Sequence, residues 1–318
     1  MNKHDEFNLR DRVEGVVIGS AVGDALGAGY EFSHAPEPAD VKMKSGTLTG
    51  QPAGFWTDDT AMAIAILEVA ARNGTLTTQE SAFEVGDRFL EWFNSGPSDV
   101  GGHTSRVLSR ARSGVHMAET AAIVQALEPR SAGNGSLMRT GPVALAHLGN
   151  DDELATAARA MSALTHPHPD ALDACVLWTI AIDRAVRLGN LEGPRAGLPM
   201  IDEHRRAQRV QTINLAENMR PKFFNLNSYV VTALQAAWSA IFWTQSDEHP
   251  FETALREAVA IGYDTDTVAA IAGALVGACY GVSAIPSEWR EGLAGWPAGC
   301  RDPDLAKLAT LAAFGLNG

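Results

Sequence analysis

The stretch "AIGYDTDTVAAIAGALVGACYG", residues 260–281, places two aspartates directly before a run of small and apolar residues. Asp264 and Asp266 therefore stand at the mouth of a segment with the composition of a buried helix. A second stretch, "GFWTDDTAMAIAILEVA" at residues 54–70, repeats the arrangement with Asp58 and Asp59. Burying a charge without a partner is costly, so two acid pairs at the starts of two core helices require an explanation.

Helical spacing of apolar residues dominates the rest of the chain, and the strict alternation typical of strands is almost absent. Short loops marked by Gly, Pro and Asn separate the periodic segments, and none has the low complexity of a linker. The sequence therefore predicts a single all-α domain over residues 1–318. Helices are predicted at residues 10–28, 59–73, 78–94, 103–113, 117–126, 137–148, 151–163, 169–188, 203–218, 227–244, 250–261, 266–282 and 302–314.

Glycines recur every four residues in two of these predicted helices, and this spacing keeps them on one helix face. A glycine inside a helix costs roughly 1 kcal/mol relative to alanine, so a whole row needs a compensating gain. Close approach of two helix backbones would supply it, and we expect these helices to be central. The rows are Gly15, Gly19, Gly23 and Gly27, and Gly273, Gly277 and Gly281.

The composition argues against several classes of partner. The chain of 318 residues is 46% hydrophobic and 20% charged, with a net charge of −13. Nucleic-acid binding needs a basic footprint that this chain lacks. The most basic patch, "EHRRAQR" at 203–209, is interpreted as a solvated helix face. The apolar run at 268–285 contains glycines and follows acids, so it is expected to be a core helix, not a membrane span.

The cysteines and the N-terminal segment favour a cytoplasmic setting. Cys175, Cys279 and Cys300 have no metal-ligand spacing and form no even framework of disulfides. The segment "MNKHDEFNLRDR" at 1–12 is charged and has no apolar core of the kind found in a secretory signal.

The doubled acidic motif has two interpretations. Asp and Thr are favoured helix caps, and acids complement the positive end of a helix, so capping explains one acid per helix. Capping does not require two acids flanked by threonines at two buried helices. Gathered carboxylates and hydroxyls without Cys or His are hard ligands that suit Mg²⁺ or Mn²⁺. Four or five carboxylates would balance two divalent cations, which could orient a substrate and activate a water.

Another motif competes for the second acidic pair. Residues 264–268, "DTDTV", also fit the D-x-D-x-[T/V] pattern of haloacid-dehalogenase phosphatases. In that family the motif follows a hydrophobic strand. Here it follows "FETALREAVAIGY" at 251–263, which has helical spacing, and no strand–helix alternation surrounds it.

Five segments together resemble the ADP-ribosylglycohydrolase family, which includes dinitrogenase-reductase-activating glycohydrolases and ADP-ribosylhydrolases. They occur in the family's order and span nearly the whole chain. They are "GSAVGDALGAGYEF" (19–32), "FWTDDTAMAIAI" (55–66), "GNGSLMRTGPVAL" (133–145), "LTHPHPDA" (164–171) and "YDTDTVAAIAGALVGACYG" (263–281).

The resemblance implies an all-α fold with two divalent cations, Mg²⁺ or Mn²⁺, at the base of an ADP-ribose cleft. Glu31 corresponds to the glutamate that the family places at or beside the metals, and Asp99 lies in a loop that approaches the scissile bond. Both are predicted catalytic residues. The metal ligands carried over are Thr57, Asp58, Asp59, Asp264, Asp266 and Thr267.

Substrate-side residues are also carried over. The stretch "GNGS" at 133–136 would open a helix at Leu137 whose backbone donors hold the pyrophosphate; the alternative is an ordinary Asn-Gly turn with a serine cap. Tyr263 departs from the family, which commonly has a small residue there, so its ring would narrow the cleft or stack on the substrate. The predicted substrate residues are Asn134, Gly135, Ser136, His166, Tyr229 and Tyr263.

The implied activity is hydrolysis of the bond between ADP-ribose and a modified protein. Arginine is the favoured linkage, because a carboxylate at Asp99 could hold a guanidinium by paired hydrogen bonds. Two alternatives stay open. One is an ADP-ribose-binding family member that has lost the chemistry, and the other is a hydrolase of another linkage or derivative, such as a serine, O-acetyl or phosphoester compound.

Overall fold

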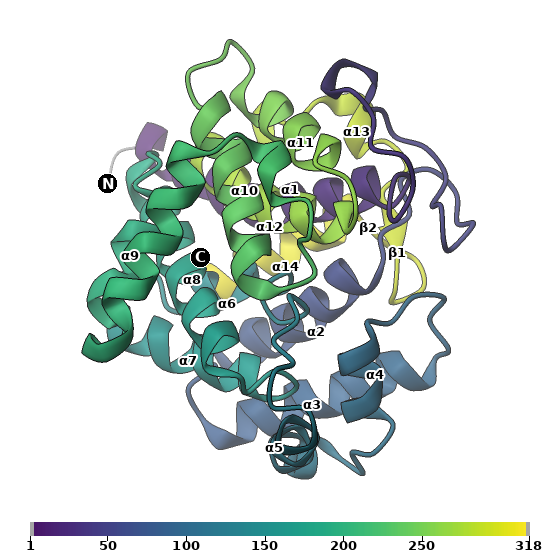
Figure 1. The fold of residues 1–318 in the computed structure, drawn as a ribbon, viewed down its shortest axis with the longest axis vertical. Helices are drawn as coiled ribbons and strands as arrows, with labels where there is room; N and C mark the ends of the chain where they lie inside the picture. Colours follow the sequence, from purple (N-terminus) through teal and green to yellow (C-terminus); the bar gives the residue numbers. More distant parts are fainter. Residues whose placement is uncertain (1–2, 316–318) are drawn as a thin grey trace.

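The computed structural model describes residues 3–315, and the predicted all-α domain is confirmed. In Figure 1, α7, α8 and α9 lie along the left and α3, α4 and α5 along the bottom, around α12 and α14 in the middle. The α-helices are α1 (Lys3–Gly27), α2 (Asp58–Asn73), α3 (Gln79–Asn94), α4 (Gly102–Leu108), α5 (Met117–Leu127), α6 (Gly141–Leu145), α7 (Asp151–Ala163), α8 (Pro169–Leu188), α9 (Glu203–Asn218), α10 (Val230–Thr244), α11 (Pro250–Ala260), α12 (Thr265–Tyr280), α13 (Ser287–Arg290) and α14 (Asp302–Phe314).

Short elements fill several of the connections. Strands β1 and β2 form an antiparallel pair, with Ala294 opposite Arg301. The 3-10 helices are η1 (Pro38–Asp40), η2 (Gly114–His116), η3 (Gly193–Met200), η4 (Pro221–Phe224) and η5 (Val282–Ala284), and the strands are β1 (Ala294–Gly295) and β2 (Cys300–Arg301).

The two glycine rows pack helices α1 and α12 directly against each other, as predicted. A Cβ atom added to Gly15 would lie 2.3 Å from the carbonyl oxygen of Gly277, and one added to Gly273 would lie 2.1 Å from that of Gly19. One added to Gly27 would lie 2.4 Å from the Cα of Asp266. The helices are therefore antiparallel, and the C-terminal end of α1 lies beside the start of α12.

The predicted helix at 137–148 is wrong. Residues 135–139 form turns, and the helix that follows, α6, is only five residues long. Pro142 is tolerated in the first turn of α6, but inside a helix that began at residue 137 it would lack the N–H for the bond to Met138 and clash with that carbonyl. The predicted helix at 103–113 also ends early, at Leu108.

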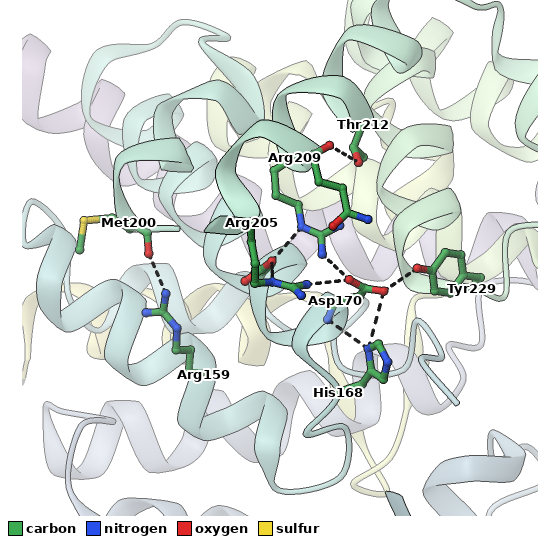
Figure 2. A network of polar contacts seen from close by, with 10 residues as sticks. Arg159, His168, Asp170, Met200, Arg205, Arg209, Thr212 and Tyr229 are labelled. Carbon is green, nitrogen blue, oxygen red and sulfur yellow. Dashed lines mark hydrogen bonds and ion pairs between the residues drawn. The ribbon is translucent and has the colours of Figure 1, made fainter. Parts of the chain in front are cut away.

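The basic patch on α9 is exposed along most of its length, as predicted, but Arg205 and Arg209 turn inward. Arg209 is 2% exposed, and its Nε donates to Asp173 at 2.8 Å. Arg205 donates to Asp173 and to Asp170, each at 2.7 Å. Figure 2 shows these arginines converging on Asp170 together with the phenol of Tyr229. The network joins α9 to the start of α8, because the buried Asp173 and the half-buried Asp170 need cationic partners.

The apolar run from Val268 onwards is α12, buried in the core. Among the described helices, none combines the length and the apolar character that crossing a bilayer requires.

Candidate functional site

The structure places both acidic pairs at helix starts and brings them together. Helix α2 begins at Asp58 and α12 at Thr265. Asp58, Asp59, Asp264 and Asp266 are all at most 8% exposed. The N-cap residues of the two helices make no side-chain capping hydrogen bond. Capping alone therefore does not account for the acids.

Asp24, in the interior of α1, supports the start of α2. Its carboxylate accepts the backbone N–H of Thr57 at 3.0 Å and that of Thr60 at 3.0 Å. It also accepts the hydroxyl protons of Thr57 at 2.9 Å and Thr60 at 2.6 Å. A residue from another helix thus satisfies two of the N–H groups at the start of α2. Within the described part of the chain, Asp58 accepts only the N–H of Gly101 at 3.2 Å, and Asp59 only the hydroxyl of Thr57 at 3.2 Å, so each keeps a carboxylate oxygen for another role.

The start of α12 is supported by neutral amides instead. Asn227 accepts the backbone N–H of Asp264 at 3.1 Å and donates to the carbonyl of Gly262 at 3.1 Å. The side chain of Asn134 donates to the Asp264 carboxylate at 2.8 Å, and the hydroxyl of Ser228 does so at 3.2 Å. Asp264 is consequently held by three polar side chains from two loops.

The carboxylates form two overlapping clusters that could hold metal ions. In each cluster, one oxygen per residue lies within 4.8 Å of the others. Asp266 belongs to both, and one oxygen of Asp59 is buried without a hydrogen-bond partner. Buried, all-oxygen donor sets with an unpaired oxygen suit hard divalent cations. The clusters are Asp24, Asp59 and Asp266, and Glu31, Asp264 and Asp266.

Burial and mutual repulsion make these acids hard to ionise in the absence of a cation. Burial, followed by the charges of Asp99 and Asp264, raises the pKa of Glu31 to about 9. Burial and the neighbouring Asp99 raise the pKa of Asp58 to about 7. The pKa values of Asp59 and Asp266 are also well above their ordinary range, mainly through burial. Bound cations would reverse this by stabilising the charged forms.

A cavity of about 350 Å³ opens over the cluster of Glu31, Asp264 and Asp266. We call it the first cavity. Several of the predicted site residues line it. They are Glu31, Asp58, Asp99, Asn134, Gly135, His166, Asp264, Asp266 and Thr267. Thr57 lines a neighbouring cavity, and Asp59, Ser136, Tyr229 and Tyr263 line neither.

His166 is buried at the wall of the first cavity and is neutral. Burial, with the nearby Arg139 and His103, holds its pKa well below the ordinary range. Its Nδ1 lies 2.7 Å from the hydroxyl of Thr165, and its ring lies 4.7 Å from that of His103. A Cβ on Gly135 would lie 3.0 Å from the His166 ring. The glycine therefore allows the chain to pass close to the imidazole.

Ser136 does not fit a phosphate cradle. It is 2% exposed, and its hydroxyl accepts a hydrogen bond from Ser162 at 2.9 Å. The helix expected to begin at Leu137 is absent, so its N-terminus cannot hold an anion. What does face the first cavity in this loop is Gly133, Asn134 and Gly135.

The two predicted substrate tyrosines are partly exposed and lie outside both cavities. The Tyr229 phenol donates to Asp170 at 2.6 Å, and burial together with this bond raises the pKa of Tyr229 to about 12. Tyr263 has a φ of 69°, a value rare outside glycine, and is 42% exposed. Its ring meets that of Phe32 edge-on, with centroids 4.9 Å apart, and Phe32 lines the first cavity.

Comparison with known proteins places this geometry in a family. The ADP-ribosylglycohydrolase family model matches residues 5–316. The chain belongs to the ADP-ribosylglycohydrolase family. It is 34% identical to ADP-ribosyl-[dinitrogen reductase] glycohydrolase of Rhodospirillum rubrum, over 89% of this chain and 90% of that protein. It is 30% identical to ADP-ribosylarginine hydrolase Tri1 of Pseudomonas putida, over 89% of this chain and 74% of that protein.

A solved structure agrees with this assignment. A chain of an "ADP-ribosylglycohydrolase-related protein complex" superposes with a TM-score of 0.74 at 30% identity, covering 97% of this chain and 99% of that one. Membership in the ADP-ribosylglycohydrolase family supports a glycohydrolase activity for this chain. The match of residues 264–268 to the haloacid-dehalogenase motif is coincidental, since these residues follow helix α11 and not a strand.

Four residues of the site were not found from the sequence. Asp24 does carry a signal, because it is an acid inside a glycine row and within the first segment that resembles the ADP-ribosylglycohydrolase family. Asn227, Ser228 and His103 lie in or beside loops, and no spacing in the sequence marks them. Their roles depend on contacts with residues distant in the sequence. His103, for example, contacts Ser131, 28 residues away, and Thr165, 62 residues away.

Proposed function

We propose that this protein is a metal-dependent hydrolase that releases ADP-ribose from ADP-ribosylated arginine on a protein. The observation that carries the proposal is the pair of buried carboxylate clusters, sharing Asp266, beneath a cavity in a chain of the ADP-ribosylglycohydrolase family. A relative at 30% identity is named for ADP-ribosylarginine, which supports the arginine linkage.

The proposed site holds two divalent cations, Mg²⁺ or Mn²⁺. The side chains proposed to hold them are Thr57, Asp58, Asp59, Asp264, Asp266 and Thr267, beside Glu31. When bound, the cations would orient the hydroxyls of the ribose and lower the pKa of a water. Asp24 and Asn227 would fix the positions of the two helix starts and so orient the metal ligands, as outer partners of metal ligands commonly do.

The chain's own residues would carry the proton. Water adds its oxygen to the anomeric carbon of the ribose while the bond to the guanidine nitrogen breaks. Glu31 or Asp99 accepts one proton from the water and returns it to the departing guanidine, which leaves as the guanidinium of the free arginine side chain. Asp99, at the edge of the first cavity, would also hold the guanidinium of the substrate.

The experiment measures release of free ADP-ribose from arginine-modified and serine-modified protein, with Mg²⁺, with Mn²⁺ and with a chelator. We expect release from the arginine-linked protein that depends on the metal. Asp99→Asn should slow it, whereas the same exchange at Asp152, an exposed residue on the first turn of α7, should not. ADP-ribose binding without any release would instead support a binding protein, and faster release from serine would overturn the arginine assignment.

A further inference from the structure

A second cavity, of about 230 Å³, lies on the other side of Asp58 and Asp99. These two acids line both cavities, whereas Glu31, Asp264 and Asp266 line only the first. A ribose placed over the carboxylate cluster would thus have Asp58 and Asp99 at its far edge. Whatever is attached to the ribose there would extend into the second cavity.

Part of the wall of the second cavity is aromatic. Phe55, Trp56, Trp92 and Trp296 contribute to it. Trp56 and Trp92 are buried, while Phe55 and Trp296 are half-buried and present part of their surface. Carboxylates that share a cavity with apolar rings are poorly solvated, which favours a cationic partner there.

The fold builds this wall from segments far apart in the chain. The backbone N–H of Trp56 donates to Ala294 on strand β1 at 3.0 Å, and its indole N–H donates to the carbonyl of Trp296 at 3.1 Å. A Cβ on Gly295 would lie 2.1 Å from the indole nitrogen of Trp56. Glycine at this position therefore allows the strand pair to pack against the segment that leads into the acidic helix start.

Aromatic faces and carboxylates together fit a flat cation. A guanidinium stacks on aromatic rings and pairs with carboxylates through its fork of donors. Trp296 already has such a contact: the guanidinium of Arg88 lies 5.1 Å from its ring centroid. Glu68 and Glu91 neutralise Arg88, and Arg88 does not line the cavity. Because Asp58 is a proposed metal ligand, Asp99 is the lining carboxylate that supplies charge for an incoming cation.

We propose that the second cavity binds the arginine side chain from which ADP-ribose is removed, with the guanidinium between Asp99 and the rings of Phe55 and Trp296. This inference rests on the proposed function and adds the binding site of the leaving group. A serine side chain has neither the charge nor the apolar stem to use this cavity, so the aromatic wall would favour arginine over serine.

The test uses the whole protein with Mn²⁺ and saturating ADP-ribose, and two small probes. Butylguanidine is a flat cation on an alkyl stem, and butylurea is its neutral counterpart. Calorimetry should show butylguanidine binding clearly and butylurea binding at least roughly tenfold more weakly, since only the former has the charge-assisted bonds. Trp296→Ala should weaken butylguanidine roughly 2- to 30-fold, the range of a cation–aromatic contact.

Matched variants make the result specific. Trp296→Phe should restore most of the binding, because a ring is kept. Trp243→Ala removes an indole that contacts Arg220 at 4.0 Å elsewhere on the protein, and it should leave butylguanidine binding unchanged. The Kd of ADP-ribose alone should be the same in all variants. If Trp296→Ala fails to fold, Phe55→Ala tests the same wall.

The outcomes separate this inference from the proposed function. Equal binding of the two probes, or no effect of either aromatic variant, overturns the leaving-group cavity even if the wild type releases ADP-ribose from arginine. Failure of the wild type to release ADP-ribose from arginine, with tight and Trp296-dependent butylguanidine binding, overturns the proposed reaction and retains a guanidinium site.

Discussion

The starts of helices α2 and α12 carry similar acids but are held in place by opposite means. At α2, the carboxylate of Asp24 accepts the N–H and hydroxyl groups of both Thr57 and Thr60. At α12, the neutral side-chain amides of Asn227 and Asn134 make hydrogen bonds to Asp264. The difference shows where the structure tolerates an extra negative charge. Asp24 belongs to a carboxylate cluster that a cation can neutralise, whereas the α12 side keeps its supports uncharged.

Asp266→Asn should have the largest effect, because Asp266 belongs to both clusters. The substitution removes a proposed ligand from both cation sites at once. Because the cations would stabilise the transition state by several kcal/mol, turnover should fall more than about 100-fold. Metal analysis of Mn²⁺-saturated protein should give about two ions per wild-type chain and fewer in the variant. A wild-type value of zero, or full activity in the variant, would contradict the metal centre. Asp152→Asn serves as the control.

The metal-free protein should lose stability as the pH rises. Asp58 and Glu31 have folded-state pKa values raised to about 7 and about 9, above those of the unfolded chain. Between the unfolded-chain pKa values of about 4 and these raised values, the folded state therefore binds more protons than the unfolded chain. The stabilisation is fully present below pH 4 and is lost as the pH rises through the folded-state pKa values. We expect the free energy of unfolding to fall by roughly 1–3 kcal/mol between pH 5 and pH 7.

Saturating Mn²⁺ should remove or reverse this slope, because the cations require ionised ligands and bind the folded state. Urea unfolding at a series of pH values, with a chelator and with Mn²⁺, measures both. Equal slopes in the two conditions would mean that the acids do not bind the metal.

Asp24→Asn tests the charged support. An amide offers one acceptor oxygen where four donors converge, and its NH₂ group would face some of them. We expect Mn²⁺ affinity to fall roughly 10- to 100-fold, as for other outer partners of metal ligands, with two ions still bound at saturation. Asp11→Asn is the matched control, since Asp11 also lies on α1 and accepts an N–H and a hydroxyl from Ser283. Loss of one ion at saturation would show that Asp24 is itself a ligand.

Asn227→Ala tests the neutral support. The substitution leaves the N–H of Asp264 and the carbonyl of Gly262 without their partner in a buried setting. A buried group without a hydrogen bond costs about 1–3 kcal/mol, and we expect a loss of that size in the free energy of unfolding of the metal-free protein. Denaturant titration measures it. A neutral result would indicate that water replaces the amide.

The same comparison explains what could be predicted from the sequence. The spacing of apolar residues and glycines is local, so the helices and the α1–α12 contact were predictable, as were the acid pairs at two helix starts. The supports of those acids were not, because Asn227 reaches Asp264 across 37 residues of chain that include helices α10 and α11. The helix predicted from Leu137 failed because its apolar residues fill the core from turns. Within "EHRRAQR", the inward-facing Arg205 and Arg209 were not predicted, because their acidic partners lie on another helix.

Tyr263→Gly should have the smallest effect. Tyr263 lines neither cavity and reaches the first one only through its edge-on contact with Phe32. Glycine removes that contact but adopts the positive φ of this position without strain. The lost ring contact lowers the free energy of unfolding and the relieved backbone strain raises it, so the net change should be small. Loss of support for Phe32 should weaken ADP-ribose binding by about 0.5–1 kcal/mol, or roughly two- to fivefold. Metal content should not change. Tyr263→Phe, which keeps the ring, should bind ADP-ribose like the wild type. If Tyr263→Gly leaves the Kd of ADP-ribose and turnover on both linkages unchanged, then the tyrosine at this position has no part in the cleft.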